Sequence, residues 1–372
     1  MRISFVGDIM LGRFIGEKYQ KYPYQLISSS LLSKLEESDY VIANLESPIT
    51  EQISTNSIAF AGSKLLLNQL QWVSCFSISN NHINDFGISG INETLQNLFD
   101  VKICCNGLYE IDYEPFIIDK SGERIAIITC TDMMNSEFGE DCPFKTLRIG
   151  TPLLEEVITK TKKQGYFTIL YAHAGSLFTR FPNPQIRDLL KLYVDKGADC
   201  IVTAHSHCLG GMELYKGVPI FYSIGDFLMD GASYRRRQSC VLNLEINHNV
   251  LNKWNITPTI TTKFLQTDFP NEKQRNKMLR SFSYVSEMLK RKDKKYDSFY
   301  KYQYKKEIFY HSLSTLHFIY ATRGLGGLLK VLYIRVWDII RMVQRLCTDR
   351  SKLRIDSDAL YSKHKLTNTE IQ

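Results

Sequence analysis

The chain has 372 residues, of which 44% are hydrophobic and 23% are charged, with a formal net charge of +7. A mean hydropathy of −0.20 is typical of a globular protein with one large or two ordinary domains, and it excludes a mostly disordered or mostly membrane-spanning chain. Nine cysteines, an odd number without a CxxC pair, suggest neither a disulfide framework nor a thiolate zinc site, which favours a reducing cytoplasm.

The first part of the chain alternates short apolar runs with helical patterns. The N-terminal stretch RISFVGDIM has Asp8 within an apolar run and no small-residue cleavage site, so it predicts a buried first strand and not a signal peptide. Strand-like runs in SDYVIANLE, WVSCFSISN, RIAIITCTD and YFTILYAHAG follow, separated by helical stretches of about 10 to 15 residues. This alternation predicts an α/β sheet that ends near residue 268, after GVPIFYSIGDFLMD and the hairpin SCVLNLEIN.

Beyond Pro270 the sequence becomes basic, rich in tyrosine and helical. Residues 270–350 contain 18 Lys and Arg against 7 Asp and Glu, whereas residues 1–269 contain 24 against 29. From Gly327 to Leu346 the apolar residues fall on one helical face, and the longest uncharged run, Ile308–Thr322, is too short to span a bilayer. We predict a body over 1–268, a basic amphipathic helical extension over 270–350 and a flexible tail over 351–372.

Five polar clusters lie at or just after the ends of the predicted strands. Because strand ends in an α/β sheet converge on one edge, these side chains are expected to share a site. Their carboxylate, amide and imidazole groups suit a site for two metal ions. The clusters contain Asp8, Asn44 with Glu46, Asn81 with His82, His173, and His205 with His207.

Each cluster alone has a simpler explanation. Asp8 could be a turn or N-cap residue, Asn81 could serve turn geometry, and His173 could be a hydrogen-bonded core histidine. His205 and His207 could be solvated loop histidines, although residues i and i+2 of a strand point to the same side. We favour the shared site because five such clusters coincide with strand ends.

Six segments also carry a family resemblance. In chain order they are GDIMLGR, NLESP, SNNHINDFG, HAG, PNPQIRDLLKLYVDKGADCIVTAHSH and YKGVPIFYSIGDFLMD. They resemble the capsule and poly-γ-glutamate synthesis proteins, the CapA-like family, which is related to calcineurin-like metallophosphoesterases, over about residues 1–231. The resemblance implies a metallophosphoesterase-like sandwich of two sheets flanked by helices, with a dinuclear metal centre at one end.

The resemblance also implies roles for individual residues. Glu46 matches the carboxylate that bridges two divalent ions (Mn, Fe or Zn), and His82 matches the histidine that donates a proton to the leaving oxygen. The implied metal ligands are Asp8, Glu46, Asn81, His173, His205 and His207. Groups expected to orient ligands or to hold an anionic substrate are Arg13, Asn44, Asp85 and Asp226.

Four features depart from the family pattern. The bridging carboxylate, Glu46, comes from NLE and not from a Gly-Asp pair. Met10 stands two residues after Asp8, where related phosphoesterases place a second ligand, and a thioether is a poor ligand for hard divalent ions. Asn80 replaces the usual glycine before Asn81, and Asp226 stands where the family usually has asparagine.

Two functional hypotheses follow. The first is a metal-dependent hydrolase or ligase-accessory enzyme that acts on a phosphorylated or polyanionic substrate in capsule or poly-γ-glutamate biosynthesis. The alternative, favoured by Met10, is a non-catalytic assembly factor that binds polymer or synthase partners. In either case, the basic extension is expected to dock a cytoplasmic protein on the inner face of the membrane or on a membrane synthase. The alternative is that the apolar face of its helix packs on the body of the same chain. A nucleic-acid partner is not expected, because the Lys- and Tyr-rich stretch 290–310 carries no recognised nucleic-acid-binding signature.

Overall fold

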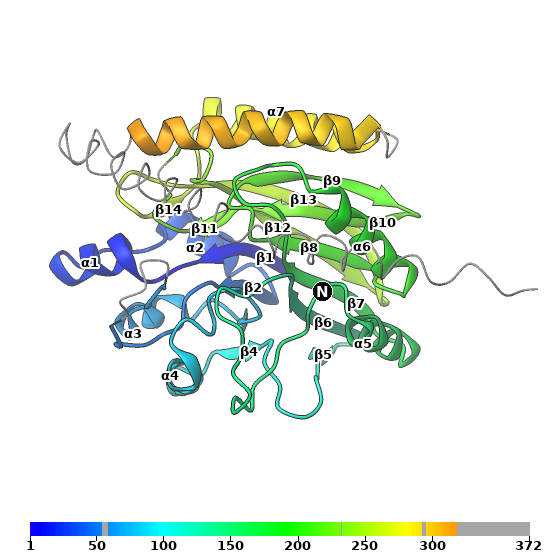
Figure 1. Cartoon of the computed structure of the whole chain (residues 1–372), viewed down its shortest axis with the longest axis horizontal. Coiled ribbons are helices and arrows are strands. Elements are labelled where there is room, and N and C mark those ends of the chain that lie inside the picture. Colours follow the sequence, from blue (N-terminus) through cyan, green and yellow to red (C-terminus); the bar gives the residue numbers. More distant parts are fainter. Residues whose placement is uncertain (54–58, 232, 292–294, 318–372) are drawn as a thin grey trace, which may run out of the picture. The chain divides into compact units, whose positions relative to one another are not determined.

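The protein is described by a computed structural model that covers residues 1–53, 59–231, 233–291 and 295–317 (Figure 1). The chain divides into two compact units, Met1–His311 and Ser312–Gln372. Only residues 312–317 of the second unit are described. The predicted amphipathic helix Gly327–Leu346 and the predicted tail 351–372 lie outside the described residues, so these expectations stay predictions.

The first unit contains two β-sheets that share an apolar interface. The larger sheet has the strand order β14-β13-β12-β1-β2-β3-β4, and β11 also pairs with β1. Strands β1 to β4 are parallel, whereas β12, β13 and β14 pair in antiparallel fashion. The bounds are β1 (Arg2–Ile9), β2 (Tyr40–Leu45), β3 (Cys75–Ser77), β4 (Cys104–Asn106), β11 (Asp226–Leu228), β12 (Gln238–Asn247), β13 (Val250–Thr261) and β14 (Thr267–Asp268).

The smaller sheet has the strand order β5-β6-β7-β8-β10-β9. Its four central strands are parallel, and the edge strands β5 and β9 are antiparallel to their neighbours. The bounds are β5 (Phe116–Lys120), β6 (Glu123–Thr131), β7 (Phe167–His173), β8 (Cys200–Ala204), β9 (Leu209–Tyr215) and β10 (Val218–Ile224).

One buried cluster of apolar side chains joins the facing sides of the two sheets. Phe5 on β1 meets Tyr171 on β7 edge to face, with the ring centroids 5.4 Å apart. The Tyr171 hydroxyl also donates a hydrogen bond of 2.8 Å to the carbonyl of Val6. Because Val6 lies two residues before Asp8, and Tyr171 two residues before His173, this contact brings the carboxyl ends of β1 and β7 together.

Helices cover the outer faces of both sheets. A second apolar cluster lies between the larger sheet and the first four α-helices, and a third lies between the smaller sheet and the later ones. The bounds are α1 (Arg13–Lys21), α2 (Ser29–Leu35), α3 (Lys64–Leu67), the 3₁₀ helix η1 (Asn68–Leu70), α4 (Gly87–Asp100), α5 (Pro152–Lys163), α6 (Pro184–Asp195) and α7 (Glu272–Leu289).

Helix α7 lies along the edge strand β9 (Figure 1). The Ser286 hydroxyl accepts a hydrogen bond of 2.9 Å from the backbone N–H of Met212, and Val285 and Leu289 are fully buried. Covering an edge strand in this way protects it from pairing with another chain. Residues 295–317 are also helical. The first compact unit therefore continues to His311, well past the boundary near residue 268 that the sequence pattern suggested.

The architecture confirms the predicted fold class. The chain forms a two-sheet α/β sandwich flanked by helices, and helices continue into its basic C-terminal part. The predicted buried first strand is β1, and the predicted closing hairpin is formed by β12 and β13. Across the residues that the structure describes, no helix is both long enough and apolar enough to cross a membrane.

Two glycines allow an unusually close approach between β1 and β11. A side chain at Gly7 would place its Cβ 1.7 Å from the carbonyl oxygen of Gly225, and Gly225 itself has a φ of +78°. Each glycine precedes an aspartate, and the close approach sets Asp8 in register with Asp226. The two Gly-Asp pairs of the sequence thus place two carboxylates side by side.

We expect Gly7→Ala to destabilise the protein, because the added methyl group would collide with a backbone carbonyl that cannot move without disturbing β11. Overpacking of this kind costs about 1–3 kcal/mol of unfolding free energy. Urea denaturation followed by circular dichroism measures the loss. Gly139→Ala is the matched control, since a Cβ at that position meets no atom within 4 Å. Equal denaturation midpoints for the two variants would contradict the expectation.

Candidate metal centre

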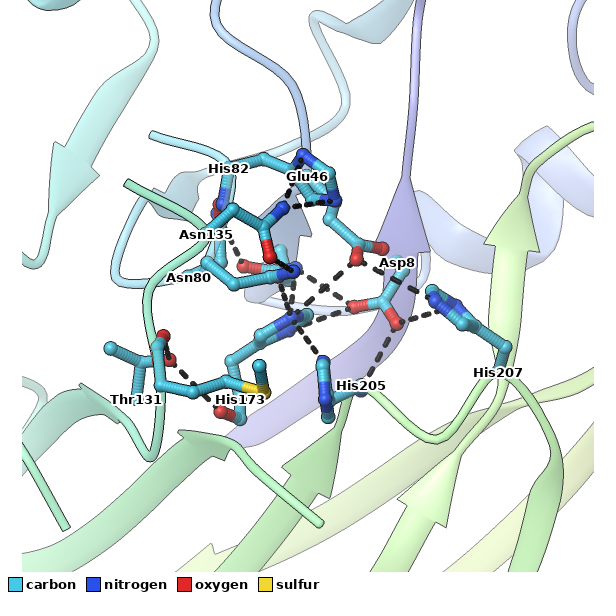
Figure 2. A network of polar contacts seen from close by, with 12 residues as sticks. Asp8, Glu46, Asn80, His82, Thr131, Asn135, His173, His205 and His207 are labelled. Atoms are coloured by element: carbon cyan, nitrogen blue, oxygen red, sulfur yellow. Dashed lines mark hydrogen bonds and ion pairs between the residues drawn. The ribbon is translucent and has the colours of Figure 1, made fainter. Parts of the chain in front are cut away.

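The carboxyl ends of strands from both sheets meet at one buried polar cluster (Figure 2). The larger sheet contributes a carboxylate at the end of β1 and another just after β2, and the smaller sheet contributes imidazoles from β7 and from the turn after β8. All of the predicted ligand side chains are buried: Asp8, Glu46, Asn81, His173, His205 and His207. The structure therefore brings together residues that are far apart in sequence.

The first candidate ion position is formed by Glu46, His173 and His205. Their ligand atoms all lie within 4.8 Å of one another. The Nε2 atom of His173 is 2.9 Å from His205 Nδ1 and 3.5 Å from Glu46 Oε1. Asn81 joins this group, because its Oδ1 lies 2.8 Å from the same Nε2. Two imidazoles, a carboxylate and an amide oxygen form a suitable ligand set for a divalent transition metal.

The second candidate position is formed by Asp8, Glu46 and His207, whose ligand atoms also lie within 4.8 Å of one another. His207 Nδ1 is 3.7 Å from Asp8 Oδ2, and its Nε2 is 3.7 Å from Glu46 Oε1. Glu46 belongs to both groups. A carboxylate shared by two adjacent groups of ligands is the arrangement that a pair of bridged ions requires.

The hydrogen bonding of the cluster fits bound cations. Within the described part of the chain, the two carboxylate oxygens of Glu46 and the Nε2 atom of His205 are buried and have no hydrogen-bond partner. Buried polar atoms in folded proteins are almost always satisfied by a partner. Bound metal ions would satisfy the two Glu46 oxygens, since carboxylate oxygen is one of their usual ligand atoms.

The buried charges shift the pKa values of the predicted ligands. Burial raises the pKa of Asp8, and nearby Glu46 raises it further. Burial opposes ionisation of Glu46, but His207 and His173 outweigh it and hold its pKa well below the ordinary value. Burial alone would lower the pKa of His173, yet Asp8 and Glu46 raise it to about 10. The two buried carboxylates are therefore stabilised by positive charge nearby. A protonated imidazole or a bound divalent cation can supply that charge.

Amide side chains hold the carboxylate and imidazole groups in place. Asn44 Nδ2 donates a hydrogen bond of 2.8 Å to Asp8 Oδ1 and lies 3.1 Å from His173 Nδ1. Asn80 Nδ2 donates to Asn44 Oδ1 and to the carbonyl of Leu45, at 3.2 and 2.8 Å. Asn80, which replaces the usual glycine, therefore connects the loop after β3 to the end of β2.

Asp226 orients His207. Its Oδ1 lies 2.8 Å from His207 Nδ1, which leaves Nε2 directed toward Glu46. A carboxylate that fixes the ring of a ligand histidine raises its basicity and its affinity for metal. The aspartate where the family usually has asparagine thus has a structural explanation in this chain.

His82 lies at the rim of the cluster among different partners. Its Nδ1 is 2.7 Å from Asp85 Oδ2, and its ring stacks on Phe60 with the centroids 3.9 Å apart. Asn135 Nδ2 lies 3.2 Å from His82 Nδ1.

Arg13 lies over the same Phe60 ring, 5.2 Å from its centroid, and forms an ion pair of 3.1 Å with Asp230. Asp85 and Phe60 therefore hold the His82 ring, and Arg13 packs on the same Phe60 ring.

Met10 is fully buried but takes a different contact. Its Sδ accepts a hydrogen bond of 3.1 Å from the backbone N–H of Gly12. The sulfur is thus committed to the backbone of the turn that begins α1. The second candidate position consequently has three predicted protein ligands, Asp8, Glu46 and His207, and no additional one at residue 10.

The backbone at the two TAHSH histidines departs from strand geometry. β8 ends at Ala204, and His205 and His207 have φ values of +96° and +57°. Such conformations are costly for residues with a side chain and persist where the surrounding contacts impose them. The ring centroids of His205 and His207 are 6.1 Å apart. A strained turn brings these two imidazoles close, and not the side-chain alternation of a regular strand.

Several residues outside the predicted set also contact the predicted site. Asn135 lies in the loop after β6, where it contacts His82 and accepts a hydrogen bond of 3.1 Å from Asn81 Nδ2. Asp132, in the same loop, accepts a hydrogen bond of 2.8 Å from Gly175 N–H. The rule that ligands follow strand ends, applied to RIAIITCTD and the next three residues, would have found both. Phe60 carried no comparable sequence signal, since its contact with His82 depends on loop packing.

The fold and site define a class of protein: a two-sheet α/β sandwich with a buried cluster that could hold metal ions. Residues 2–231, more than half of the chain, match the model of the family described as bacterial capsule synthesis protein PGA_cap. The chain belongs to this family, which confirms the resemblance found in the sequence.

Two relatives illustrate the family. The PGA biosynthesis protein CapA of Bacillus subtilis (strain 168) is 29% identical over 273 residues, which cover 68% of this chain and 70% of that protein. The capsule biosynthesis protein CapA of Bacillus anthracis is 26% identical over 266 residues, which cover 67% of this chain and 64% of that protein. The chain thus spans slightly less than two thirds of the length of the second relative.

Solved structures are more distant. A hypothetical protein from Thermus thermophilus aligns over 69% of this chain and 98% of its own, with 11% identity and a TM-score of 0.43. The 5'-nucleotidase from Candida albicans aligns over 76% of this chain and 58% of its own, with 12% identity and a TM-score of 0.41.

The two overlapping groups of ligands predict a graded loss of metal. We expect about two Mn²⁺ per wild-type chain and about one in His205→Ala or His207→Ala, because each histidine belongs to one group only. Glu46→Gln should lower binding at both positions, since it removes the shared carboxylate. Titration calorimetry and elemental analysis measure the stoichiometry. Asp195→Asn, at the surface, is the control. Two ions retained by Glu46→Gln would refute the bridging role.

Proposed function

We propose that the protein is a metal-dependent hydrolase that acts on a phosphorylated or polyanionic substrate in capsule or poly-γ-glutamate biosynthesis. The observation that carries the proposal is the position of Glu46, shared by two groups of ligands at the meeting point of the two sheets. The names of the two CapA relatives support the biological process, and the ligand set supports the reaction type.

The ligands of the proposed centre would be Asp8, Glu46, Asn81, His173, His205 and His207. Two divalent ions bound there supply Lewis-acid charge, which stabilises negative charge on the substrate and activates water for attack. Asp8 and Glu46 contribute the negative charge that retains the ions, and the flanking amides and Asp226 keep the ligand side chains oriented before substrate arrives.

His82 is proposed as the general acid that protonates the leaving oxygen. Asp85 Oδ2 lies 2.7 Å from its Nδ1 and fixes the ring orientation. Proton delivery is assigned to Nε2, which lies 3.3 Å from Asn135 Nδ2. The stacked Phe60 ring restricts rotation of the imidazole. The Asp85 carboxylate also accepts a hydrogen bond of 2.8 Å from the Phe60 N–H, so Asp85 contacts both His82 and the residue that stacks on it.

Arg13 is proposed to hold an anionic group of the substrate. Its side chain is 40% exposed and packs on Phe60, the ring that stacks on His82, while its ion pair with the buried Asp230 anchors the guanidinium. Arginine offers a planar pair of donors suited to carboxylate and phosphate oxygens. A substrate bound there would carry negative charge close to the group that His82 protonates.

The contact made by Met10 favours a second candidate function, a non-catalytic assembly factor. With Met10 Sδ bonded to the backbone, the position formed by Asp8, Glu46 and His207 has few protein ligands, and weak occupancy there would impair catalysis. Such a factor would bind polymer or a membrane synthase through the basic segment 270–350. Docking of that segment on an anionic membrane surface remains a prediction.

We expect the Mn²⁺-loaded wild-type protein to hydrolyse a generic aryl phosphodiester, and Glu46→Gln to lose this activity together with its metal. Asp195→Asn should retain both. Release of the phenolate, followed by its absorbance, measures the rate. A wild-type protein that binds two ions but hydrolyses neither aryl esters nor capsule polymer would favour the assembly factor.

A separate expectation concerns His82→Ala, which should keep its metal but lose turnover on substrates with poor leaving groups. Loss of a general acid costs about 10²- to 10⁴-fold in rate, and the loss shrinks when the leaving oxygen needs no proton. Rates across a series of aryl leaving groups test this. The exposed His248→Asn serves as the control. An equal loss on good and poor leaving groups would argue against a proton donor.

A further inference from the structure

Residues beyond the family match reach the candidate metal centre. The match ends at residue 231, but the first compact unit continues to His311. Glu307 and His311, on the helical stretch 295–311, contact the loop that follows β7. The part of the chain that sequence analysis assigned to a separate extension therefore contributes to the surroundings of the site.

A buried ion pair connects this helical stretch to the loop. Glu307 is almost fully buried, and its carboxylate accepts hydrogen bonds from the backbone N–H and the Nε of Arg180, both at 2.8 Å, and from Nη2 at 2.5 Å. Arg235 Nη1 lies 3.4 Å from the same carboxylate. A charge buried with several partners holds its surroundings in one arrangement, because breaking the pair leaves an uncompensated charge.

Phe178, two residues before Arg180, contacts a predicted metal ligand. Its ring stacks on His311 with the centroids 3.8 Å apart, and on His207 with the centroids 5.8 Å apart and an angle of 29°. Its backbone N–H donates a hydrogen bond of 2.8 Å to the carbonyl of Ser206, inside the HSH turn. With a φ of +62°, Phe178 needs support from its neighbours to keep this conformation.

Arg236 adds a second contact from beyond the family match. Its guanidinium lies over the Phe178 ring, 5.1 Å from the centroid, and its Nη2 is 4.0 Å from Asp226 Oδ2. Asp226 in turn holds His207 Nδ1. The ring of His207 is therefore constrained from two directions, by the Phe178 ring and by the Asp226 carboxylate.

We infer that Glu307 and Phe178 are positioning residues for the metal ligand His207. Glu307 holds the loop through Arg180, and the loop places Phe178 against the His207 ring and the HSH turn. The inference rests on the metal centre proposed above. A ligand oriented before the ion binds loses less freedom on binding, and partners that orient ligands contribute about 10- to 100-fold to metal affinity.

The chain offers a matched control for the buried pair. Arg187 Nε and Nη2 lie 3.0 and 2.6 Å from the Glu213 carboxylate, and Nη2 also donates to the carbonyl of Leu289. This pair connects α6, β9 and α7, as the Arg180 and Glu307 pair connects the loop and the later helical stretch. Glu213→Gln therefore weakens an equivalent buried pair that does not lead to His207.

Mn²⁺ titration of the full-length protein by calorimetry tests the inference. We expect Glu307→Gln and Phe178→Leu to weaken Mn²⁺ binding by about 10- to 100-fold at the position that includes His207. Phe178→Tyr, which keeps the ring, should bind like the wild type, and so should Glu213→Gln. Circular dichroism confirms folding, and the two Phe178 variants provide the test if Glu307→Gln does not fold.

Three outcomes would overturn the inference. Unchanged affinity in both Glu307→Gln and Phe178→Leu would show that His207 needs no such support. An equal loss in Glu213→Gln would assign the effect to general destabilisation. A wild-type protein that binds no Mn²⁺ would overturn the metal centre itself, and that failure is visible before any variant is made.

Discussion

Asp8 and Glu46 are carboxylates buried where the two sheets meet, and removing such charges from water is costly unless positive charge lies nearby. The larger sheet supplies both carboxylates, while the smaller sheet supplies His173 and the strained turn with His207. The same two carboxylates raise the pKa of His173, because they stabilise the protonated imidazole. The sandwich is thus built around the meeting of acidic groups from one sheet with basic groups from the other.

Contacts outside the cluster keep the two sheets in the required register. The hydrogen bond from Tyr171 to Val6 joins β7 to β1 two residues before their functional side chains. The close approach of Gly7 and Gly225 places Asp226 beside Asp8, where Asp226 can orient His207. The proposed chemistry therefore depends on packing within the core, and changes there would reach the site without touching a ligand.

The C-terminal part of the first unit packs on the sandwich and also contacts a loop beside the predicted site. Helix α7 covers the edge strand β9, and the stretch 295–311 fixes the loop after β7 through Glu307. The basic character of this region is compatible with that role, because its Lys and Arg side chains can remain at the surface while Val285, Leu289 and Tyr296 are buried. The residues up to His311 are therefore part of the packed first unit, although this region also has an excess of Lys and Arg.

The sequence by itself determined the α/β class and the buried strand β1, and it predicted the polar clusters that the structure brings together, because strand alternation and polar residues at strand ends are local patterns. It also indicated Glu46 as the shared carboxylate through family resemblance. Only the tertiary structure decided the partner of Asp226, the contacts of Asn135 and Phe178, and the continuation of the unit to His311. These depend on side-chain packing between segments far apart in the chain, which no local periodicity encodes.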